Sequence, residues 1–262
     1  MLKIDHISKT FAKGTINEKK ALDDIFLTVD TGDFITIIGS NGAGKSTLFN
    51  SISGEFFVDT GKIILDDEDI TKKPDYFRSK DIGKLFQNPL RGTAPHMTIK
   101  ENLALAYMRA DHNTNMFSKI TRKDENKFKD ELKKLDMNLE DRLNTQVGLL
   151  SGGQRQALTL LMATIVPPKV LLLDEHTAAL DPVMAEKVMI LTNNIVKENN
   201  ITCLMVTHNM KMALATGNRT LIMNNGKIIH ELNEDIKKTM NIDELLKVFR
   251  ESLNDDRIIL EN

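Results

Sequence analysis

Residues 39–47, with the sequence GSNGAGKST, constrain the fold of this 262-residue chain more than any other segment. They match the pattern G-x-x-x-x-G-K-[ST], in which Gly39, Gly44, Lys45 and Ser46 are the specified positions. The stretch before the loop is predicted to be a strand, and the stretch after it a helix. Such a loop turns backbone N–H groups inward and the helix adds its positive end, so phosphate is the expected ligand. An accidental glycine-rich turn is the alternative, and the flanking strand and helix argue against it.

The residues of this loop have distinct predicted roles. Its glycines permit unusual backbone dihedrals and leave room for a phosphate group to approach closely. Lys45 is predicted to reach the β- and γ-phosphates of a nucleotide, and the Ser46 hydroxyl to ligate Mg²⁺. The predicted nucleotide-binding residues of the loop are Gly39, Ser40, Asn41, Gly42, Ala43, Gly44, Lys45, Ser46 and Thr47.

A second feature is the apolar run KVLLLDE at residues 169–175, which ends in the adjacent carboxylates Asp174 and Glu175. A continuous apolar strand is typical of a buried parallel sheet, and ligands bind at the carboxyl ends of such strands. Asp174 is therefore predicted to hold Mg²⁺ through water, and Glu175 to polarise the water that attacks the γ-phosphate. The alternative is a pair of exposed acids that cap the following helix.

A third feature is the segment LLSGGQRQALTLL, in which Ser151 and two glycines open a predicted helix. A hydroxyl, free backbone N–H groups and a helix N-terminus together form another anion-binding arrangement. One ATP does not need two such helix ends. The surplus indicates a second molecule whose nucleotide the Ser151 end would cover, although an ordinary N-cap is the simpler interpretation of this segment taken alone.

The rest of the chain alternates strands and helices, apart from an all-helical block at about residues 88–168. We expect a single domain over residues 1–262, with an α/β core at 1–87 and 169–230 and a helical tail at 231–262. Acidic and basic residues nearly balance, at 37 against 35. Composition therefore gives no sign of a nucleic-acid partner.

The single cysteine and the hydropathy pattern limit the location of the chain. Cys203 lies in the apolar-rich segment ITCLMVT and cannot form an internal disulfide, so a buried structural thiol is expected. The charged N-terminus lacks the apolar core of a signal peptide. No stretch approaches the roughly 18 apolar residues of a membrane span. We expect a cytoplasmic location, with any membrane role depending on a partner.

Taken in order, these motifs resemble those of ABC-transporter ATPase domains over about residues 2–230. The segments that carry the resemblance are the phosphate loop, Gln87, LSGGQ at 150–154, LLLDE at 171–175, ALD at 179–181 and His208. The resemblance implies an α/β P-loop NTPase fold of the ABC-ATPase type. Such a fold has a RecA-like mixed-sheet core, an N-terminal antiparallel β subdomain and an inserted helical subdomain.

The resemblance also implies roles for individual residues. Gln87 would contact Mg²⁺ and the attacking water and would sense the membrane partner, while His208 would contact the γ-phosphate. Asp181 would lie at a dimer interface. Phe11 would stack on adenine, although a buried core phenylalanine is an alternative.

Three sets of residues follow from the motifs and the resemblance together. The predicted catalytic residues are Lys45, Gln87, Glu175 and His208. The predicted magnesium ligands are Ser46, Gln87 and, through water, Asp174. The predicted cover over the opposite subunit's ATP consists of Ser151, Gly152, Gly153 and Gln154.

His176 occupies a position at which this family usually has proline. A structural role in the turn and a chemical role beside the catalytic glutamate are both open, and the structural role is favoured. Four other histidines, His6, His96, His112 and His230, are expected to be surface or packing residues, because they lack metal-ligand spacing.

The resemblance implies ATP hydrolysis by a head-to-tail homodimer that drives a separate membrane permease, with the ATPase bound at the inner face of the membrane. The sequence from LDEHTAALDP (residues 173–182) onward resembles that of the ATPase subunits of tryptophan/tyrosine-type bacterial importers. Those importers also use an extracytoplasmic lipoprotein receptor. Aromatic amino acids or a related small solute are the expected cargo. A soluble assembly-type ABC ATPase and an exporter or lipoprotein-releasing ATPase stay open as alternatives.

Overall fold

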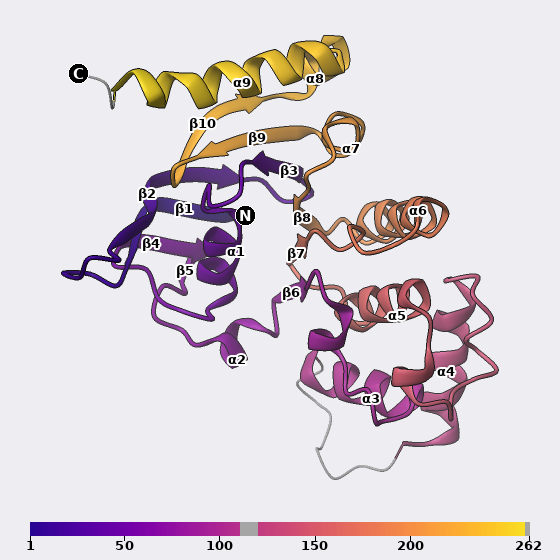
Figure 1. Cartoon of the computed structure of the whole chain (residues 1–262). Coiled ribbons are helices and arrows are strands. Elements are labelled where there is room, and N and C mark those ends of the chain that lie inside the picture. Colours follow the sequence, from indigo (N-terminus) through magenta and orange to yellow (C-terminus); the bar gives the residue numbers. More distant parts are fainter. Residues whose placement is uncertain (111–119, 260–262) are drawn as a thin grey trace. The chain divides into compact units, whose positions relative to one another are not determined.

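The computed structural model describes residues 1–110 and 120–259, which divide into two compact units (Figure 1). The first unit comprises Met1–Arg78 and Thr202–Asn262, and the second comprises Ser79–Ile201. The prediction for His112 lies outside the described residues. Within the part of the chain that is described, no helix is long and apolar enough to cross a membrane.

The first unit contains most of the strands. Its strands are β1 (Leu2–Phe11), β2 (Lys19–Val29), β3 (Phe34–Gly39), β4 (Thr60–Leu65), β5 (Glu68–Asp69), β8 (Thr202–Val206), β9 (Arg219–Asn224) and β10 (Lys227–Leu232). Its helices are α1 (Lys45–Ser53), α2 (Asp75–Arg78), α7 (Met210–Ala215), α8 (Glu234–Thr239) and α9 (Ile242–Ile259).

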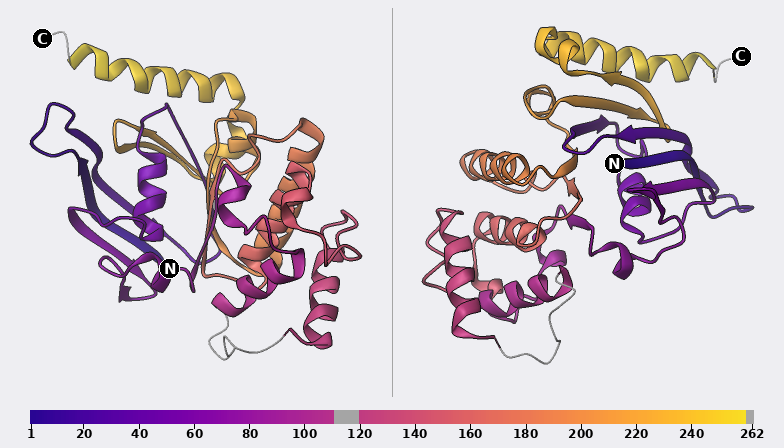
Figure 2. Two further views of the ribbon diagram at one scale, coloured as in Figure 1. Left: turned by 60° about the horizontal axis from the view of Figure 1, so that its bottom comes forward. Right: turned by 180° about the vertical axis from the view of Figure 1, so that it is seen from behind.

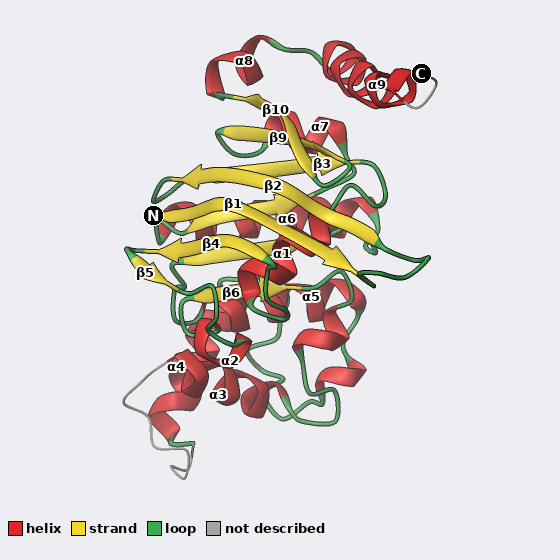
Figure 3. Cartoon of the chain, turned by 90° about the vertical axis from the view of Figure 1, so that its left-hand side faces the viewer, coloured by secondary structure: helices red, strands yellow, loops and turns green. Residues whose placement is uncertain are grey.

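Two groups of strands organise this unit (Figure 3). The first is antiparallel, in the order β2-β1-β4-β5, and the second has the order β10-β9-β3-β8. In the second group β8 and β9 both run parallel to β3, whose six residues are all buried. β2 and β3 follow each other in the sequence yet belong to different groups. The central strand β3 thus delivers the phosphate loop from the interior of the unit.

The C-terminal helices pack onto the second group of strands. Leu245 of α9 is fully buried against Ile222 of β9 and Leu232 of β10, and α9 runs beside β10 in both views of Figure 2. The preceding helix α8 lies within the predicted helical tail, although it was not predicted as a separate helix. Its N-cap is Asn233, whose side chain accepts a hydrogen bond from the Ile236 N–H. The helical character expected of the tail is therefore observed as two helices.

The second unit is mainly helical. Its helices are η1 (Pro89–Gly92), α3 (Ile99–Ala110), α4 (Arg122–Lys133), η2 (Val147–Leu149), α5 (Gly152–Thr164) and α6 (Pro182–Glu198), and its strands are β6 (Ile82–Leu85) and β7 (Val170–Asp174). β6 and β7 are parallel. One apolar core joins α3, α4, α5 and α6, with Phe128, Leu132 and Leu158 at most 2% exposed. The all-helical block expected at about residues 88–168 contains the helices from η1 to α5, and the apolar run at 169–175 contains β7.

Candidate functional site

The phosphate loop leaves β3 and enters α1 through backbone conformations that glycine permits. Gly42 and Gly44 have φ of 84° and 103°, in the left-handed region that other residues rarely adopt. Gly39 pairs with Met223 of β9, and a Cβ at Gly39 would overlap the Met223 carbonyl oxygen. The glycines are therefore required by the conformation of the loop and by close packing behind it.

The N-terminus of α1 is open. Gly44 is its N-cap, and within the described structure no side chain caps it. Lys45 is 6% exposed and folds back, so that its Nζ donates to the carbonyl oxygens of Gly39 at 2.8 Å and Ser40 at 3.0 Å. Since no side-chain cap forms here in the part of the chain that the structure describes, this helix end is suited to an anion.

Two backbone hydrogen bonds hold the loop from behind. Gly226, in the tight turn between β9 and β10, donates its N–H to the carbonyl oxygen of Ala43 at 3.0 Å. The same residue accepts a hydrogen bond of 2.9 Å from the N–H of Asp23 in β2. The turn thereby links β2 to the phosphate loop and supports the loop from behind.

The C-terminus of α1 is held by Arg78, which the sequence analysis missed. Its Nη1 donates to the carbonyl oxygens of Ser51 and Ile52 at 2.7 and 2.9 Å, and it also donates to Thr71 and Lys73. The side chain is 2% exposed, and burial lowers the pKa of Arg78 to about 10. It stays charged at neutral pH and opposes the negative end of the helix dipole. No local sequence pattern reports this contact, because its acceptors are backbone carbonyls.

Phe11 and His208 are exposed residues of the first unit. Phe11 is 39% exposed and its ring meets Phe56 edge-on at 5.3 Å between centroids. The alternative prediction of a buried core phenylalanine is therefore wrong. His208 follows β8, which pairs with β3, and the Thr207 N–H donates to the Ile37 carbonyl at 3.1 Å. His208 is thus carried by the strand next to the one that leads into the phosphate loop.

In the second unit Gln87 and Glu175 meet. The parallel register of β6 and β7 pairs Leu85 with Leu173, so residues 87 and 175 stand two positions beyond the same register pair. Gln87 Nε2 donates to Glu175 Oε2 at 3.1 Å. Glu175 has φ of 48°, an uncommon value for a residue with a side chain, and functional residues often have such strained backbones. Asp174 precedes it as the last residue of β7.

His176 anchors the turn after Glu175 to α6. It is 2% exposed, and its Nε2 lies 3.2 Å from Thr192 Oγ1. The Thr192 hydroxyl donates to the Val188 carbonyl oxygen at 2.8 Å, so His176 Nε2 is the donor in the first contact. Burial lowers the pKa of His176 to about 4, so the imidazole is neutral at pH 7. These contacts agree with the favoured structural role.

The LSGGQ segment at residues 150–154 caps its own helix. Ser151 is the N-cap of α5, its Oγ accepts from the Gln154 N–H at 3.3 Å, and Gln154 Oε1 accepts from the Ser151 N–H at 3.3 Å. Arg155 braces the preceding turn through hydrogen bonds to Val147, Gly148 and Leu150 carbonyls. The side of Gly153 packs against Met184 of α6. The ordinary N-cap interpretation is therefore observed, while Ser151 stays exposed.

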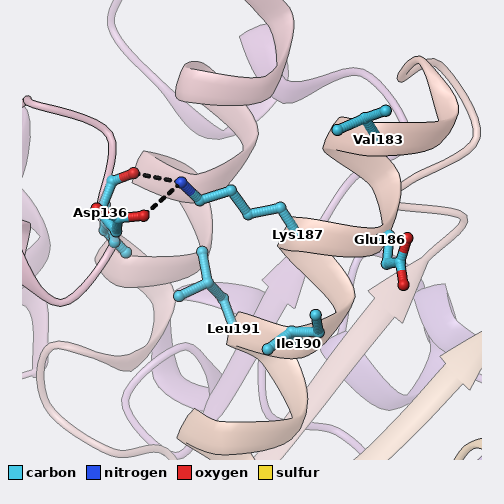
Figure 4. A pocket seen from close by; sticks show the side chains of 7 residues that line it. Asp136, Val183, Glu186, Lys187, Ile190 and Leu191 are labelled. Atoms are coloured by element: carbon cyan, nitrogen blue, oxygen red, sulfur yellow. Dashed lines mark hydrogen bonds and ion pairs between the residues drawn. The ribbon is translucent and has the colours of Figure 1, made fainter.

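α6 begins at another predicted site residue. Asp181 is its N-cap and accepts a hydrogen bond from the Met184 N–H at 3.1 Å. Two turns along, Lys187 donates to the backbone carbonyl of Asp136 and, at 2.8 Å, to its carboxylate beside a shallow groove (Figure 4). This contact ties α6 to the beginning of the segment that follows α4. Asp181 has a helix-capping function in the chain itself, besides any role at an interface.

The predicted site residues are thus distributed over both units. The phosphate loop, Phe11 and His208 lie in the first unit, and Gln87, Asp174, Glu175, Ser151–Gln154 and Asp181 lie in the second. Among the described residues, no three His, Cys, Asp or Glu side chains gather as a metal cluster. Three of the histidines expected at the surface, His6, His96 and His230, are exposed, and Cys203 is buried as predicted.

Known proteins with similar sequences are transport ATPases. Residues 22–178 match the family described as ABC transporter. The chain is 41% identical over 249 residues to a tyrosine transport ATP-binding protein of Clostridioides difficile strain R20291, which covers 95% of this chain and 98% of that protein. It is 32% identical over 242 residues to a phosphonates import ATP-binding protein of Lactococcus lactis subsp. cremoris strain SK11, covering 88% and 92%.

Solved structures with a similar fold are ATP-binding cassettes. One is a dimeric cassette in a post-hydrolysis state bound to ADP and Pi, with a TM-score of 0.77, 27% identity, and coverage of 89% of this chain and 99% of that one. Another is the ADP conformation of a cassette of an ABC transporter, with a TM-score of 0.74, 29% identity, and coverage of 91% and 93%. The predicted fold and the prediction of an ATP hydrolase are confirmed, and the chain belongs to the ABC transporter ATP-binding family.

Proposed function

We propose that this ATP-binding subunit works as a head-to-tail homodimer and drives import of a small solute through a separate permease. The observation that carries the proposal is the hydrogen bond of 3.1 Å between Gln87 and Glu175. Gln87 is the residue proposed to sense the membrane partner, and Glu175 is the one proposed to activate water. If the membrane partner shifts the segment that carries Gln87, the position of the Glu175 carboxylate should change with it, and hydrolysis depends on that position.

Nucleotide binding is proposed to begin at the first unit. The exposed Phe11 ring would stack on adenine, and the N–H groups at the open end of α1 would bind the phosphates. Lys45 would exchange its contacts with the Gly39 and Ser40 carbonyls for contacts with the β- and γ-phosphates. Thr47, in the first turn of α1, would complete the phosphate contacts.

Mg²⁺ is the metal that the proposed ligands fit. Ser46, Gln87 and Asp174 offer hydroxyl, amide and carboxylate oxygens, which are the donors that Mg²⁺ prefers, with Asp174 acting through water. When bound, the ion would neutralise charge on the β- and γ-phosphates. These three residues are proposed as its holders by the chemistry of their oxygens.

Hydrolysis is proposed to use Glu175 and His208. The Glu175 carboxylate would accept a hydrogen bond from the attacking water and orient it, while the Gln87 amide keeps that carboxylate in place. His208 would contact the γ-phosphate from the strand next to β3. Lys45 would offset the charge that develops on the transferred phosphoryl group.

The second copy of the chain is proposed to complete the site. Ser151, Gly152, Gly153 and Gln154 would cover the ATP held by the opposite subunit, and Asp181 would lie at the interface. The similarity to a dimeric cassette bound to ADP and Pi supports this arrangement. Substituting Glu175→Gln should slow hydrolysis and accumulate an ATP-bound dimer, which size-exclusion chromatography with light scattering would detect. A variant that stays monomeric with ATP would contradict the proposed dimer.

A groove of the second unit is the proposed contact for the membrane partner. It has a volume of about 370 Å³ and lies at the end of β6, where its lining residue Phe86 directly precedes Gln87 in the sequence. Its lining combines the Phe86 ring with Lys84, Arg91 and Arg109, and no acidic residue among those described contributes to it. A permease segment with an acidic side chain would complement this lining. Binding to the permease would hold the ATPase at the inner face of the membrane.

Aromatic amino acids are the proposed cargo, with an extracytoplasmic lipoprotein receptor as a further partner. The similarity to a tyrosine transport ATP-binding protein supports this choice. Transport is favoured over a soluble assembly ATPase, because relatives named for tyrosine, carnitine and phosphonate transport span most of the chain. Export is less favoured, since the phosphonate relative is named for import.

Co-purification from the native membrane tests transport and cargo together. We expect a hydrophobic permease to co-purify, and tyrosine or tryptophan with the receptor to stimulate ATP hydrolysis several-fold in the reconstituted complex. A phosphonate serves as the matched ligand control. A soluble scaffold protein in place of the permease would contradict transport, and stimulation by another solute alone would contradict the cargo only.

A further inference from the structure

A second lysine lies beside the phosphate loop, and the sequence analysis gave it no role. Lys19 opens β2, and its Nζ is 3.2 Å from the position that a Cβ on Gly42 would occupy. Among the described residues its ammonium group forms no hydrogen bond or ion pair, whereas the neighbouring Lys20 pairs with Asp23. Lys19 thus carries a positive charge that no acidic side chain in the described structure offsets.

The backbone determines where Lys19 lies. Two residues further along β2, the carbonyl oxygen of Ala21 stands against Gly44 of the loop. The hydrogen bonds through the β9–β10 turn hold β2 in this position. β2 therefore runs alongside the loop, with residue 19 next to Gly42 and residue 21 next to Gly44.

The register of β2 also places Lys19 opposite the proposed adenine platform. Lys19 is the antiparallel pairing partner of Phe11 in β1. Residues that face each other across antiparallel strands have Cβ atoms about 5 Å apart. Since adenine would stack on Phe11 and phosphate would bind at the loop, Lys19 stands between the two ends of the nucleotide.

We propose that Lys19 is a further nucleotide-binding residue, whose ammonium group contacts the phosphates nearest the ribose, which ATP and ADP share. This inference rests on the proposed role of the phosphate loop. An ammonium group is a compact charge with three donors on a flexible stem, which suits a phosphate chain that changes between ATP and ADP. Lys45 approaches the phosphates from inside the loop, and Lys19 approaches them from the strand beside it.

Isothermal titration of the full chain with ATP and with ADP tests the proposal. We expect Lys19→Gln to weaken both nucleotides by a similar factor of about three to ten, as for one exposed charge contact. The loss should shrink with increasing salt, because the contact is at the surface. Lys19→Arg should restore most of the affinity, and the control Lys20→Gln should bind like the unsubstituted chain.

Amine acylation followed by mass spectrometry is an independent readout on the unsubstituted protein. ATP and ADP should both protect the Lys19 amine from acylation and leave Lys20 reactive. Unchanged affinity in Lys19→Gln, or equal labelling of Lys19 with and without nucleotide, overturns the inference. If Lys45→Ala loses affinity in the same series, the phosphate-loop assignment stands without Lys19, whereas unchanged binding in both variants removes that assignment as well.

Discussion

The N-termini of α1 and α5 are both glycine-rich helix ends, but only the N-terminus of α5 is capped by side chains in the described structure. At α1, Gly44 in a left-handed conformation opens the helix and no side chain caps it within the described residues. At α5, Ser151 and Gln154 cap each other's backbone N–H groups. The first end is ready for an anion, and the second must compete with its own cap. The difference supports the proposal that α1 holds the chain's own nucleotide, while α5 engages only the nucleotide of a second copy.

Removing the cation at the open end should have the largest effect. We predict that Lys45→Ala weakens ATP binding about a thousandfold, because it deletes charge-assisted contacts to two phosphates. Isothermal titration measures the change, and Lys20→Ala is the matched control, since its ammonium is already paired with Asp23. Retained affinity in Lys45→Ala would mean that α1 is not the nucleotide-binding end.

An arginine supports each of the two helices, Arg78 at the C-terminus of α1 and Arg155 at the turn before the N-terminus of α5. Arg78→Ala should lower the free energy of unfolding by about 3 kcal/mol, because four backbone carbonyls lose a buried charged donor. Arg155→Ala should cost about 1 kcal/mol, since Arg155 is only partly buried. Chemical denaturation of both variants measures the difference. Equal losses would show that the two supports do not differ.

Glycine substitution compares the packing behind the two ends. Gly39→Ala should cost about 2 kcal/mol, because the new Cβ would overlap a backbone oxygen of β9, which cannot move without disturbing the strand pair. Gly153→Ala should cost about 1 kcal/mol or less, since the overlapping atom is the flexible tip of Met184. Chemical denaturation tests which variant loses more stability, provided that the slope of unfolding free energy against denaturant concentration is the same in both. A larger loss in Gly153→Ala would reverse the expected order.

A smaller effect is expected from His176, which should make the stability of the unit that carries α5 depend on pH. Burial lowers the pKa of His176 to about 4 in the folded chain from its ordinary value of 6.5, so below pH 6.5 the unfolded chain gains a proton that the folded chain does not. Stability should fall by about 1 kcal/mol between pH 7 and pH 5.5. His176→Gln should remove that part of the pH dependence. Parallel pH profiles for the two proteins would contradict a buried neutral histidine.

Local patterns in the sequence were sufficient to predict most elements and both helix ends. The strand–loop–helix at residues 34–53 and the buried strand before Asp174 follow from hydrophobic pattern and glycine positions alone. Helix α8, which was predicted only as part of a helical tail, has a readable signal of its own, since Asn233 caps it, acids occupy its first turn and lysines its last. Its shortness gives the hydrophobic pattern too few residues to repeat.

Contacts between distant residues could not be predicted in the same way. The hydrogen bond between Gln87 and Glu175 joins residues 88 positions apart, and it depends on the register of β6 and β7. The contact of Arg78 with α1 uses backbone carbonyls, which no side-chain motif reports. Lys19 reaches the phosphate loop only because β2 is hydrogen-bonded to the β9–β10 turn.

The central proposal is that α1 holds the chain's own nucleotide and α5 engages the nucleotide of a second copy. Its most direct test is the effect of Ser151→Ala on two separate measurements. In the monomer, we predict that its affinity for ATP equals that of the unsubstituted chain, because α1 alone holds the nucleotide. In the background of Glu175→Gln, we predict that Ser151→Ala abolishes the ATP-dependent dimer, while Ser151→Thr, which keeps the hydroxyl, retains it. A loss of monomer affinity as large as that of Lys45→Ala, or an ATP dimer that forms without Ser151, would contradict the division of roles between the two helix ends.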